Sequence, residues 1–566
     1  MAAGSLLPTL GWVFGLIFAG LELSRRNILI VSPPASDSSA AEFVLSKNYR
    51  TAFHFQPDHN WMNDPNAPMY YEGYYHLFYQ YNPDSALWVS NISWGHSVST
   101  DLVHWTGLGI AFSPSKPFDI SGCWSGSATF LPGNKPVILY TGLDTEGGGV
   151  QNVAYPKNLS DPFLREWIKP DYNPLIKPFE GVNASWFRDP STAWVGQDGL
   201  WRILVGLKLG NDGYAILYKS KDFVTWDRAK DPLHYTNGSG MWECPDFFPL
   251  GEEGKYVLKI SFFDNFYERY TVGRYDEERD LFVGDDPSSN DYNLWQRVDH
   301  GSFYASKTFV DVNKNRRIMW GWSNESDSKP DDVAKGWSGV QTIPRIVSLD
   351  ASGKQLVQWP IEEIESLRGK HIHLSNVELE PGSLHELEGL TASQADIEVE
   401  FELTMSLNRA EPFDQNWLLD PPKLCRERGP SVHGGLGAFG LLVLASDNLE
   451  EHTAVYFRVF NTGGNYAVLM CTDQRKSSAR NELYKPAFGG FVNVDMKKDG
   501  KISLRTLIDH SIVESFGGGG KTVITSRVYP TSLSKSSTHL YAFNNGTESV
   551  KISEFNGWNM AKAIIS

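Results

Sequence analysis

The stretch Trp-Met-Asn-Asp-Pro-Asn-Ala-Pro at residues 61–68 leads directly into the aromatic run Tyr-Tyr-Glu-Gly-Tyr-Tyr-His-Leu-Phe-Tyr at residues 70–79. The aromatic run predicts a β-strand. Proline fixes its own backbone angle, and Asn and Asp side chains bond the nearby backbone, so the carboxylate of Asp64 is held rigidly. The stretch is therefore either an Asx-turn that opens a hairpin or a rigid mount for a nucleophilic carboxylate.

Two further acidic motifs favour the second interpretation. Residues 187–194 read Phe-Arg-Asp-Pro-Ser-Thr-Ala-Trp, and residues 241–248 read Met-Trp-Glu-Cys-Pro-Asp-Phe-Phe. Bulky neighbours desolvate a carboxyl group and raise its pKa, whereas Arg188 is expected to lower the pKa of Asp189 and to orient it. One protonated and one ionised acid is the combination that glycosidic cleavage needs.

The three motifs, in this order, resemble the Trp-Met-Asn-Asp-Pro-Asn, Arg-Asp-Pro and Glu-Cys-Pro signatures of glycoside hydrolase family 32, the plant invertases and fructan exohydrolases. The resemblance runs from about residue 50 to the C-terminus. Further family-like stretches are residues 124–129, 304–307 and 358–360. The resemblance implies an Asp nucleophile, a Glu general acid and base, and a third acid that binds fructose hydroxyls.

Composition favours a large all-β protein. The chain has 566 residues, 13% of them aromatic, with 51 Gly and 31 Pro. This length exceeds the roughly 250–300 residues of a single domain, and aromatic-rich short runs between turn signals are typical of β structure. Ser-x-Asp-apolar-Val-x-Trp occurs at residues 99–105 and again at 220–226, as radially repeated sheets produce.

We therefore expect a β-propeller, and the resemblance sets its blade number at five. The propeller is expected over residues 50–350, followed by an acidic linker at 351–370 and a β-sandwich at 371–566, where strands alternate polar and apolar residues. The stretch Asp-His-Ser-Ile-Val-Glu at residues 509–514 is interpreted as structural rather than as a catalytic triad. The glycine run at 517–520 lacks the context of a phosphate loop.

The N-terminal 45 residues are expected to direct the chain into the secretory pathway. An apolar run from Leu6 to Leu21 precedes Arg25 and Arg26, which fits either a signal peptide or a short membrane anchor. The mature enzyme is then expected in the vacuole or in the apoplast and cell wall, without a stable membrane partner. Six glycosylation sequons support this route: Asn91, Asn158, Asn183, Asn237, Asn324 and Asn545.

The charge and the cysteines limit the partners. A net charge of −16 without a basic run argues against nucleic acid and favours a neutral sugar, either fructan or sucrose.

Cys425 and Cys471 are close enough in sequence to pair, which the resemblance also implies, whereas Cys123 and Cys244 are expected to be buried thiols. No metal ligand set and no cofactor is expected. We expect a monomer.

The resemblance assigns a role to each acid. Asp64 attacks the anomeric carbon of a terminal fructosyl unit, Glu243 protonates the leaving oxygen and then activates water, and Asp189 binds fructose. Asp246 is interpreted as structural. The residues expected to line the sugar pocket are Trp61, Asn63, Gln80, Trp88, Trp124, Ser125 and Arg188, with Phe263 and Phe266 at its outer wall.

Substrate choice is expected to depend on residues 259–266, which read Lys-Ile-Ser-Phe-Phe-Asp-Asn-Phe. Sucrose-cleaving members carry an Asp and a Lys where Phe263 and Phe266 stand, so the polar clamp on the glucosyl unit is lost. Asp264 replaces that Asp if the stretch shifts by one residue. The sequence thus favours a fructan exohydrolase that cleaves β-2,1 or β-2,6 linkages. Acid invertase is the alternative, and an inactive lectin-like propeller is a third hypothesis.

Overall fold

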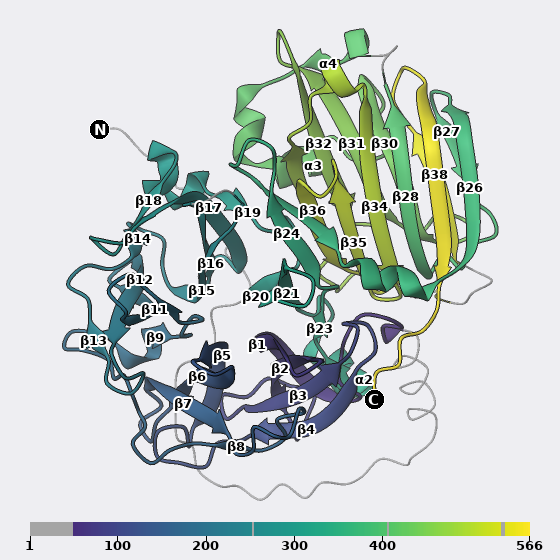
Figure 1. The fold of residues 1–566 in the computed structure, drawn as a ribbon. Helices are drawn as coiled ribbons and strands as arrows, with labels where there is room; N and C mark the ends of the chain where they lie inside the picture. The colour runs from purple at the N-terminus through teal and green to yellow at the C-terminus, as the bar shows by residue number, and fades with distance from the viewer. Residues whose placement is uncertain (1–48, 252–253, 404–406, 532, 534–537) are drawn as a thin grey trace, which may run out of the picture. The chain divides into compact units, whose positions relative to one another are not determined.

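The structure is a computed structural model that describes residues 49–251, 254–403, 407–531, 533 and 538–566. These residues are mostly β structure, as the sequence predicts, and their strands form seven sheets (Figure 1). The expected signal or anchor segment at residues 1–45 lies outside the described residues. Across the described ranges, no helix is both long and apolar enough to span a membrane.

Five of the sheets follow one another between residues 60 and 360. The first has the order β22 (Trp337–Ser338), β1 (Asn60–Tyr71), β2 (Tyr74–Asn82), β3 (Ser93–Ser99), β4 (Thr106–Phe112), and the second β5 (Gly122–Leu131), β6 (Lys135–Leu143), β7 (Gly149–Pro156), β8 (Trp167–Ile168). The third has the order β10 (Trp194–Val195), β11 (Trp201–Leu209), β12 (Asp212–Ser220), β13 (Asp227–Arg228), with β9 (Phe187–Arg188) and β14 (His234–Thr236) attached.

The fourth sheet has the order β15 (Trp242–Pro249), β16 (Tyr256–Phe262), β17 (Tyr267–Asp276), β18 (Leu281–Gly284), with β19 (Gln296–Arg297) attached. The fifth has the order β20 (Tyr304–Asp311), β21 (Arg316–Ser323), β24 (Arg345–Leu349), β25 (Leu356–Pro360), with β23 (Val340–Gln341) attached. Because β22 pairs in parallel with β1, the end of this region joins the sheet that begins it.

The repeated motif of the sequence forms the same turn in two sheets. Oδ1 of Asp101 accepts hydrogen bonds from the backbone N–H groups two and three positions on, at 2.9 and 2.7 Å, and Oδ1 of Asp222 does the same at 2.9 and 2.7 Å. The turns follow β3 and β12. Side-chain oxygens that bond the backbone in this way fix a tight turn locally. The sequence repeat therefore marks the same type of turn in both sheets.

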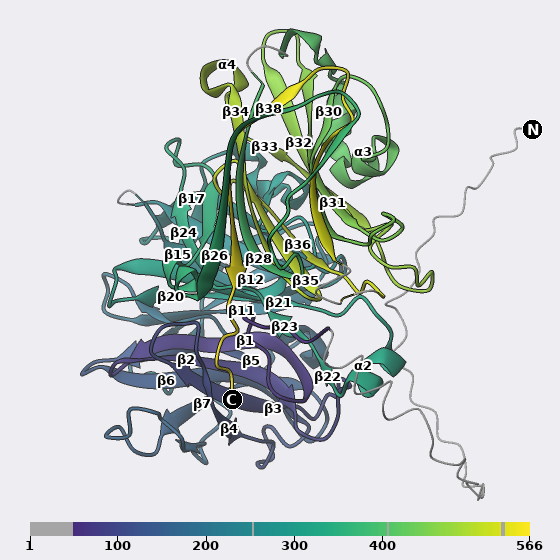
Figure 2. The same cartoon turned by 90° about the vertical axis from the view of Figure 1, so that its right-hand side faces the viewer.

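Two larger sheets follow. One has the order β26 (Arg368–Leu379), β38 (Val550–Met560), β28 (Gln394–Glu402), β34 (Lys501–Asp509), β35 (Ile512–Gly517), β36 (Thr522–Arg527). The other has the order β27 (Ser383–Glu386), β37 (His539–Asn544), β30 (Leu436–Ala445), β31 (Thr453–Asn461), β32 (Tyr466–Asp473), β33 (Ala487–Val492), with β29 (Glu411–Pro412) attached. Apolar side chains of both sheets share one core, and Figure 2 shows the sheets as two layers. This is a β-sandwich.

Helices are short. The α-helices of the described residues are α2 (Lys329–Lys335), α3 (Pro421–Glu427) and α4 (Met496–Asp499). The 3₁₀ turns are η1 (Ala184–Trp186), η2 (Pro287–Asn290), η3 (Tyr292–Leu294), η4 (Glu362–Leu367), η5 (Leu407–Arg409) and η6 (Gln415–Leu419).

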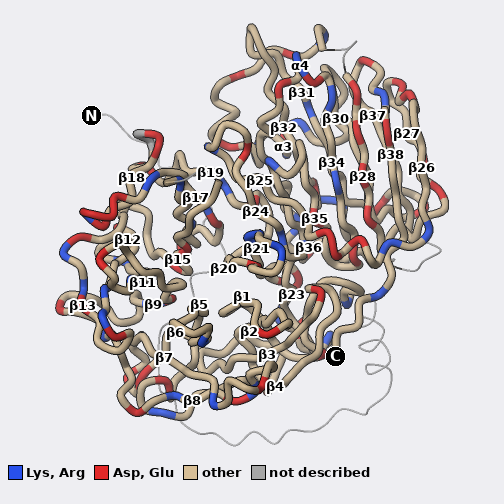
Figure 3. Tube along the Cα trace, in the orientation of Figure 1, with Lys and Arg blue, Asp and Glu red and all other residues tan. Residues whose placement is uncertain are grey.

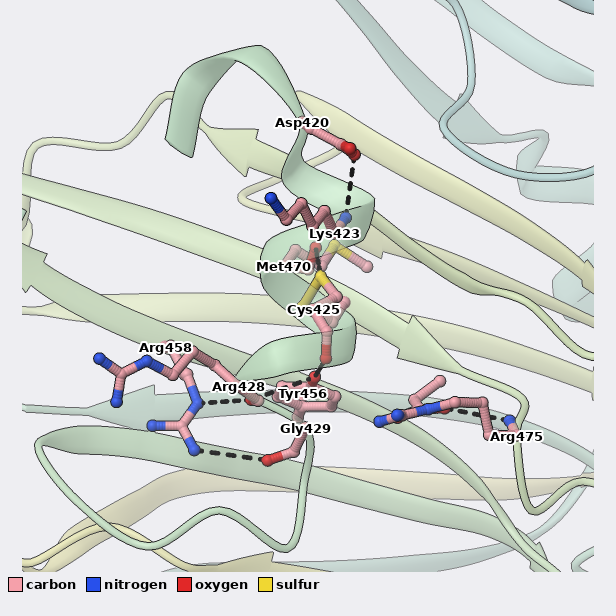
Figure 4. Close-up of a disulfide and its surroundings, with 11 residues drawn as sticks. Asp420, Lys423, Cys425, Arg428, Gly429, Tyr456, Arg458, Met470 and Arg475 are labelled. Atoms are coloured by element: carbon pink, nitrogen blue, oxygen red, sulfur yellow. Dashed lines mark hydrogen bonds and ion pairs between the residues drawn. A yellow bond between two sulfur atoms is a disulfide. The ribbon is translucent and has the colours of Figure 1, made fainter. Parts of the chain in front are cut away.

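Cys425 and Cys471 form the disulfide that the resemblance implies, and it ties α3 to β32. Figure 4 shows the hydrogen bonds around it: the Tyr456 hydroxyl donates to the carbonyl of Cys425 at 3.0 Å, and Arg458 donates to the carbonyl of Arg428 at 2.8 Å. The covalent link and these bonds together fix the short helix on the sheet. Cys123 and Cys244 are free and buried, as predicted.

A buried charge network joins the sandwich to the N-terminal sheets. His54 is fully buried between two carboxylates of the sandwich, with Nδ1 2.8 Å from Asp509 and Nε2 2.9 Å from Glu514. Glu514 also binds the guanidinium of Arg345 at 2.6 Å, and Arg345 in turn pairs with Asp299 at 3.0 Å. The stretch at residues 509–514 is therefore an interdomain contact, which agrees with its structural interpretation.

Apolar packing and a second charge cluster complete this interface. Apolar side chains of the N-terminal sheets, such as Phe53 and Trp320, share one cluster with Leu507 and Phe516 of the sandwich. In Figure 3, basic and acidic segments lie next to one another around β21, β35 and β36. The interface thus combines a hydrophobic area with ion pairs that are removed from water.

The second cluster contains three carboxyl groups of residues 325–332. Glu325 binds Arg527 of the sandwich at 2.7 Å and Lys335 at 2.9 Å, and Asp327 and Asp332 also contact the Lys335 ammonium. These acids lie close enough together to hold a cation. One ammonium and one guanidinium balance two of the three charges, and burial and Glu325 raise the pKa of Asp332 to about 8, so the cluster is explained as an interdomain ion network.

The glycine run after β35 is a turn that only glycine can form. Gly518, Gly519 and Gly520 have φ angles of 59°, 68° and 86°, in the left-handed region. A Cβ on Gly520 would lie 1.9 Å from the carbonyl oxygen of Gln358 in β25. The backbone of Gln358 donates to the carbonyl of Gly520 at 3.0 Å, so the run brings the sandwich against the fifth sheet.

We predict that His54→Gln destabilises the protein most in mild acid. The two carboxylates raise the pKa of His54 against the opposing effect of its burial, so the imidazolium is stabilised in the folded state. A raised pKa gives stability that is complete below the unfolded value of about 6.5 and is lost as the pH rises through the folded value. The difference in Tm between wild type and His54→Gln should therefore be larger at pH 5 than at pH 9.

The matched control is His539→Gln, because His539 also lies between two carboxylates, Glu386 and Asp447, but at the surface. Its effect should be small, since exposed ion pairs contribute about 0–1 kcal/mol. A Tm difference for His54→Gln that is independent of pH, or no larger than that of the control, would show that the network does not depend on a charged His54.

Candidate active site

The first strand of four of the five N-terminal sheets carries a β-bulge at a corresponding place. The pairing register shifts at residues 62–65 in β1, 123–126 in β5, 243–246 in β15 and 304–307 in β20. In the third sheet, Asp189 follows the short β9 with a φ of 67°. These strands contact one another, β1 with β5 and β20, and β15 with β20. A bulge re-aims the side chains beside it, so residues from all five sheets converge.

Asp64 lies in a closed ring of hydrogen bonds. It accepts bonds from the hydroxyl of Ser125 and from the amide of Asn63, the latter at 3.0 Å. The Asn63 amide also donates to Gln80, whose own amide donates to Ser125 at 2.9 Å. Four residues that the sequence singles out therefore lie together, and each holds another in place. The expected Asx-turn is absent here, because residues 60–71 form the bulged strand β1, and the ring of hydrogen bonds holds the carboxylate in place.

Glu243 is held from both sides. Its Oε1 accepts bonds from Nε and a terminal nitrogen of Arg188 at 2.9 and 2.8 Å, and its Oε2 accepts a bond from the Tyr304 hydroxyl at 2.7 Å. Burial raises the pKa of Glu243, and the nearby charge of Asp189 raises it further, whereas Arg188 and Tyr304 oppose the rise. Burial is the largest of these effects, so the pKa of Glu243 lies above its ordinary value.

Asp189 is anchored by the backbone. Its own N–H donates to Thr141 at 2.7 Å, and its Oδ2 accepts the N–H of Cys244 at 3.0 Å. The Cys244 sulfur lies 3.7 Å from Asp189 and 3.8 Å from Asp64, so the buried thiol stands between two of the acids. The expectation that Arg188 orients Asp189 is wrong, because the Arg188 guanidinium bonds Glu243 instead, and Asp189 forms its bonds with Thr141 and Cys244.

The pKa values of the two central acids are both raised. Burial raises the pKa of Asp64 to about 7; Asp189 and Glu243 raise it, and the bonds from Ser125 and Asn63 oppose the rise. The pKa of Glu243 is raised by burial and by Asp189, so the acids form one coupled site. Its titration therefore belongs to the cluster rather than to one residue.

A buried cation supports the bulges behind the acids. Lys259 donates to the carbonyl of Cys244 at 3.0 Å and to that of Ser306 at 2.6 Å, and pairs with Glu268 at 3.3 Å. It thus joins the bulge of β15 to that of β20. Asp246 has the structural role expected of it, since it accepts the N–H of Thr308 at 2.8 Å and joins the same two strands.

Aromatic side chains surround the acids on the solvent side. Trp61 donates to Asn63 at 2.8 Å, and the rings of Trp88 and Trp124 lie 6.4 Å apart. The Phe263 side chain is 40% exposed, with its ring 5.4 Å from the guanidinium of Arg188. The Phe266 ring stacks on Tyr304 at 4.2 Å. Every residue predicted to line the pocket thus contacts an acid, a partner of an acid or another pocket residue.

Three residues of the site were not singled out by sequence reasoning. Tyr304 binds Glu243, Cys244 lies between two acids, and the Trp186 ring lies 5.4 Å from the Arg188 guanidinium. Tyr304 belongs to a family-like stretch and Trp186 precedes the Arg-Asp-Pro motif, so their proximity to motifs was the available signal. The contacts of Tyr304 and Cys244 are with residues far away in the chain, which the local sequence does not specify.

Converging carboxyl groups of raised pKa, surrounded by aromatic rings on an all-β scaffold, define the protein as a glycosidase. The models for the N-terminal and the C-terminal domain of glycosyl hydrolases family 32 match residues 54–360 and 363–559. The chain belongs to glycosyl hydrolase family 32.

Similar proteins include plant enzymes. The chain is 53% identical to beta-fructofuranosidase, insoluble isoenzyme 4, of Oryza sativa subsp. japonica, over 97% of this chain and 94% of the relative. It is also 53% identical to fructan 1-exohydrolase of Triticum urartu, over 96% and 92%. A crystal structure of a variant of fructan 1-exohydrolase IIa from Cichorium intybus in complex with 1-kestose is 50% identical, with a TM-score of 0.88 over 92% of this chain and 99% of that chain.

We predict that Tyr304→Phe moves the alkaline limb of the pH–rate profile to higher pH. The Tyr304 hydroxyl stabilises the ionised form of Glu243 and so lowers its pKa; without that bond the acid stays protonated to a higher pH. The profile of kcat/KM against pH measures this shift. In the control Tyr270→Phe, which removes a buried hydroxyl that bonds Gln296, the limb should not move. A limb that stays in place or moves to lower pH in Tyr304→Phe would contradict the assignment.

Proposed function

We propose that the protein is a retaining exo-glycoside hydrolase that releases terminal fructose from β-2,1 or β-2,6 fructans. Membership of the family and similarity to fructan 1-exohydrolases support the reaction class. The observation that carries the substrate choice is the position of Phe263 and Phe266. Both are exposed beside the groups that hold Glu243, so an apolar wall stands where a polar clamp would bind a glucosyl unit.

In this mechanism Asp64 attacks the anomeric carbon of the terminal fructose, and Glu243 protonates the leaving oxygen. Water then hydrolyses the fructosyl-enzyme, with Glu243 as the base. The carboxyl groups of Asp64 and Glu243 should lie about 5–5.5 Å apart, as in other retaining enzymes. Asp189, held by two backbone bonds, stabilises the positive charge that develops on the sugar. The reaction needs no metal or cofactor.

The pocket residues divide between the two ends of the cleaved bond. The ring of Asn63, Gln80 and Ser125 holds Asp64 and therefore lines the side of the terminal fructose. Arg188 holds Glu243 and therefore lines the side of the leaving sugar. Trp61, Trp88 and Trp124 offer ring faces to the sugars between these two sides.

We infer that the five N-terminal sheets are the blades of a closed five-bladed propeller over residues 50–350. The parallel pairing of β22 with β1 and the contacts between first strands support closure. The expected linker at 351–370 needs correction, because residues 356–360 form β25 of the fifth sheet and β26 of the sandwich begins at Arg368, so that η4 (Glu362–Leu367) is the link. In this arrangement the first strands surround a central channel, and the acids meet at its mouth.

The chain is expected to enter the secretory pathway and to act in the vacuole or the cell wall. Four of the six sequons, Asn91, Asn158, Asn183 and Asn237, are exposed and suit glycosylation. Asn324 and Asn545 are partly buried, and the Asn545 amide donates to the carbonyl of Pro430 at 2.6 Å. We propose a monomer.

Invertase activity is the second candidate, supported by the similarity to a beta-fructofuranosidase. We predict that the initial rate of fructose release is higher on inulin or levan than on sucrose, at equal concentrations of fructosyl ends. The apolar wall removes binding energy for a small polar leaving group but not for a fructosyl chain. Fast cleavage of sucrose with negligible cleavage of both fructans would establish an invertase. Complete inactivity on all three substrates would establish the inactive propeller.

We predict different defects for Asp64→Ala and Glu243→Ala on an aryl fructoside, whose leaving group needs no protonation. Both variants should lose about three to six orders of magnitude in kcat on fructan. On the aryl fructoside, Glu243→Ala should release a burst of one equivalent of phenol and then stall, because the first step is rescued and water activation is not. Asp64→Ala should give no burst. A burst from Asp64→Ala, or a kcat on fructan close to that of the wild type in either variant, would contradict the two roles.

A further inference from the structure

A cluster of three side chains extends the site on the side of Glu243. The guanidinium of Arg188 lies 5.4 Å from the ring centres of both Trp186 and Phe263, and these two rings lie 5.7 Å apart. Trp186 belongs to the turn before β9, and Phe263 to the turn between β16 and β17. Two neighbouring sheets therefore build one aromatic wall around the residue that holds the general acid.

An ion pair lies at the outer part of this wall. The ammonium of Lys208, on β11, is 3.2 Å from Oδ2 of Asp264, which follows Phe263 in the turn. The same ammonium lies 5.2 Å from the ring centre of Trp186. Lys208 thus contacts the wall from the third sheet, and Asp264 contacts it from the fourth. The pair is linked to Arg188 through Trp186 and Phe263.

The pair is fixed in place but retains bonding capacity. Gly240, with a φ of 73°, leaves no room for a Cβ, which would lie 1.9 Å from the Asp264 carboxylate. The side chains of Lys208 and Asp264 are 18% and 42% exposed. Within the described ranges, each has the other as its hydrogen-bond partner, so two ammonium donors and most of the carboxylate lone pairs are available.

We propose that Lys208 and Asp264 bind hydroxyl groups of the leaving saccharide, at the ring beyond the one that carries the cleaved bond. This proposal rests on the proposed function and defines its substrate preference. Glu243 protonates the leaving oxygen and Arg188 holds Glu243, so the wall on the Arg188 side faces the leaving saccharide. Because Trp186 and Phe263 lie between Arg188 and the ion pair, the pair reaches a second ring rather than the first.

The proposal explains how a site without the polar clamp binds an oligosaccharide. Phe263 and Phe266 deny polar partners to the single glucosyl unit that leaves from sucrose. A leaving group of two sugars extends past the wall and meets one donor and one acceptor held in register by their own ion pair. Hydrogen bonds to charged groups are stronger than neutral ones, so the second ring contributes to binding. The polar contact that residues 263 and 266 have lost is supplied by Lys208 of a neighbouring sheet.

The test compares 1-kestose, whose leaving group is a disaccharide, with sucrose, whose leaving group is one sugar. In Lys208→Met and in the isosteric Asp264→Asn, kcat/KM for 1-kestose should fall about tenfold relative to kcat/KM for sucrose. Because kcat/KM reports the step that expels the leaving group, water attack on the fructosyl-enzyme does not obscure the effect. Lys208→Arg, which keeps the charge, should restore most of the ratio.

The control is Lys219→Met, since Lys219 forms a similar ion pair with Asp280 elsewhere in the third sheet, at 2.8 Å. An equal loss on both substrates would assign a merely structural role to the Lys208–Asp264 pair and overturn the proposal. An unchanged ratio would overturn it as well, while fructose release by the wild type would leave the proposed function intact. A wild type that releases no fructose from either substrate would overturn both.

Discussion

The constraint on which the site depends is that three carboxyl groups, Asp64, Asp189 and Glu243, are brought together away from water. Burial and mutual repulsion both oppose this, and both raise the pKa of Asp64 and Glu243. Bulges in the first strands aim the side chains at one point, and hydrogen bonds from Ser125, Arg188 and the Cys244 N–H hold them there. The rest of the fold serves to keep this unfavourable arrangement in place.

Two buried cations stabilise this arrangement of carboxyl groups in different ways. Lys259 bonds the backbone at two bulges and is fully buried, so it fixes geometry while its charge is balanced by Glu268. Arg188 contacts Glu243 directly and keeps its pKa from rising further. The same logic appears at the domain interface, where His54 and Arg345 neutralise carboxylates that the sandwich supplies. The domain interface and the site thus both depend on buried charged groups, each of which has an oppositely charged partner.

The sequence predicted the β class and the acids because each of these leaves a local trace. Turn residues beside Asp64 and aromatic residues beside Glu243 mark positions where charge is otherwise avoided. The role of Tyr304 leaves no such local trace, because it meets Glu243 from the fifth sheet. Proximity in sequence also misled in one place, since Arg188 precedes Asp189 but serves Glu243. Contacts between sheets depend on where the bulges lie in each strand pairing, and this cannot be predicted from a single sequence.

The two phenylalanines link substrate choice to acid catalysis. Phe266 stacks on the ring of Tyr304, and the hydroxyl of that tyrosine bonds Glu243, so the residue at position 266 acts on the general acid through one intermediate. A lysine there would bring a cation toward Glu243 and lower its pKa, which favours activity at lower pH. Phe263 packs on Arg188, the other partner of Glu243. In the proposed mechanism, the residues at positions 263 and 266 therefore affect both which leaving saccharide is bound and the pH at which its oxygen is protonated.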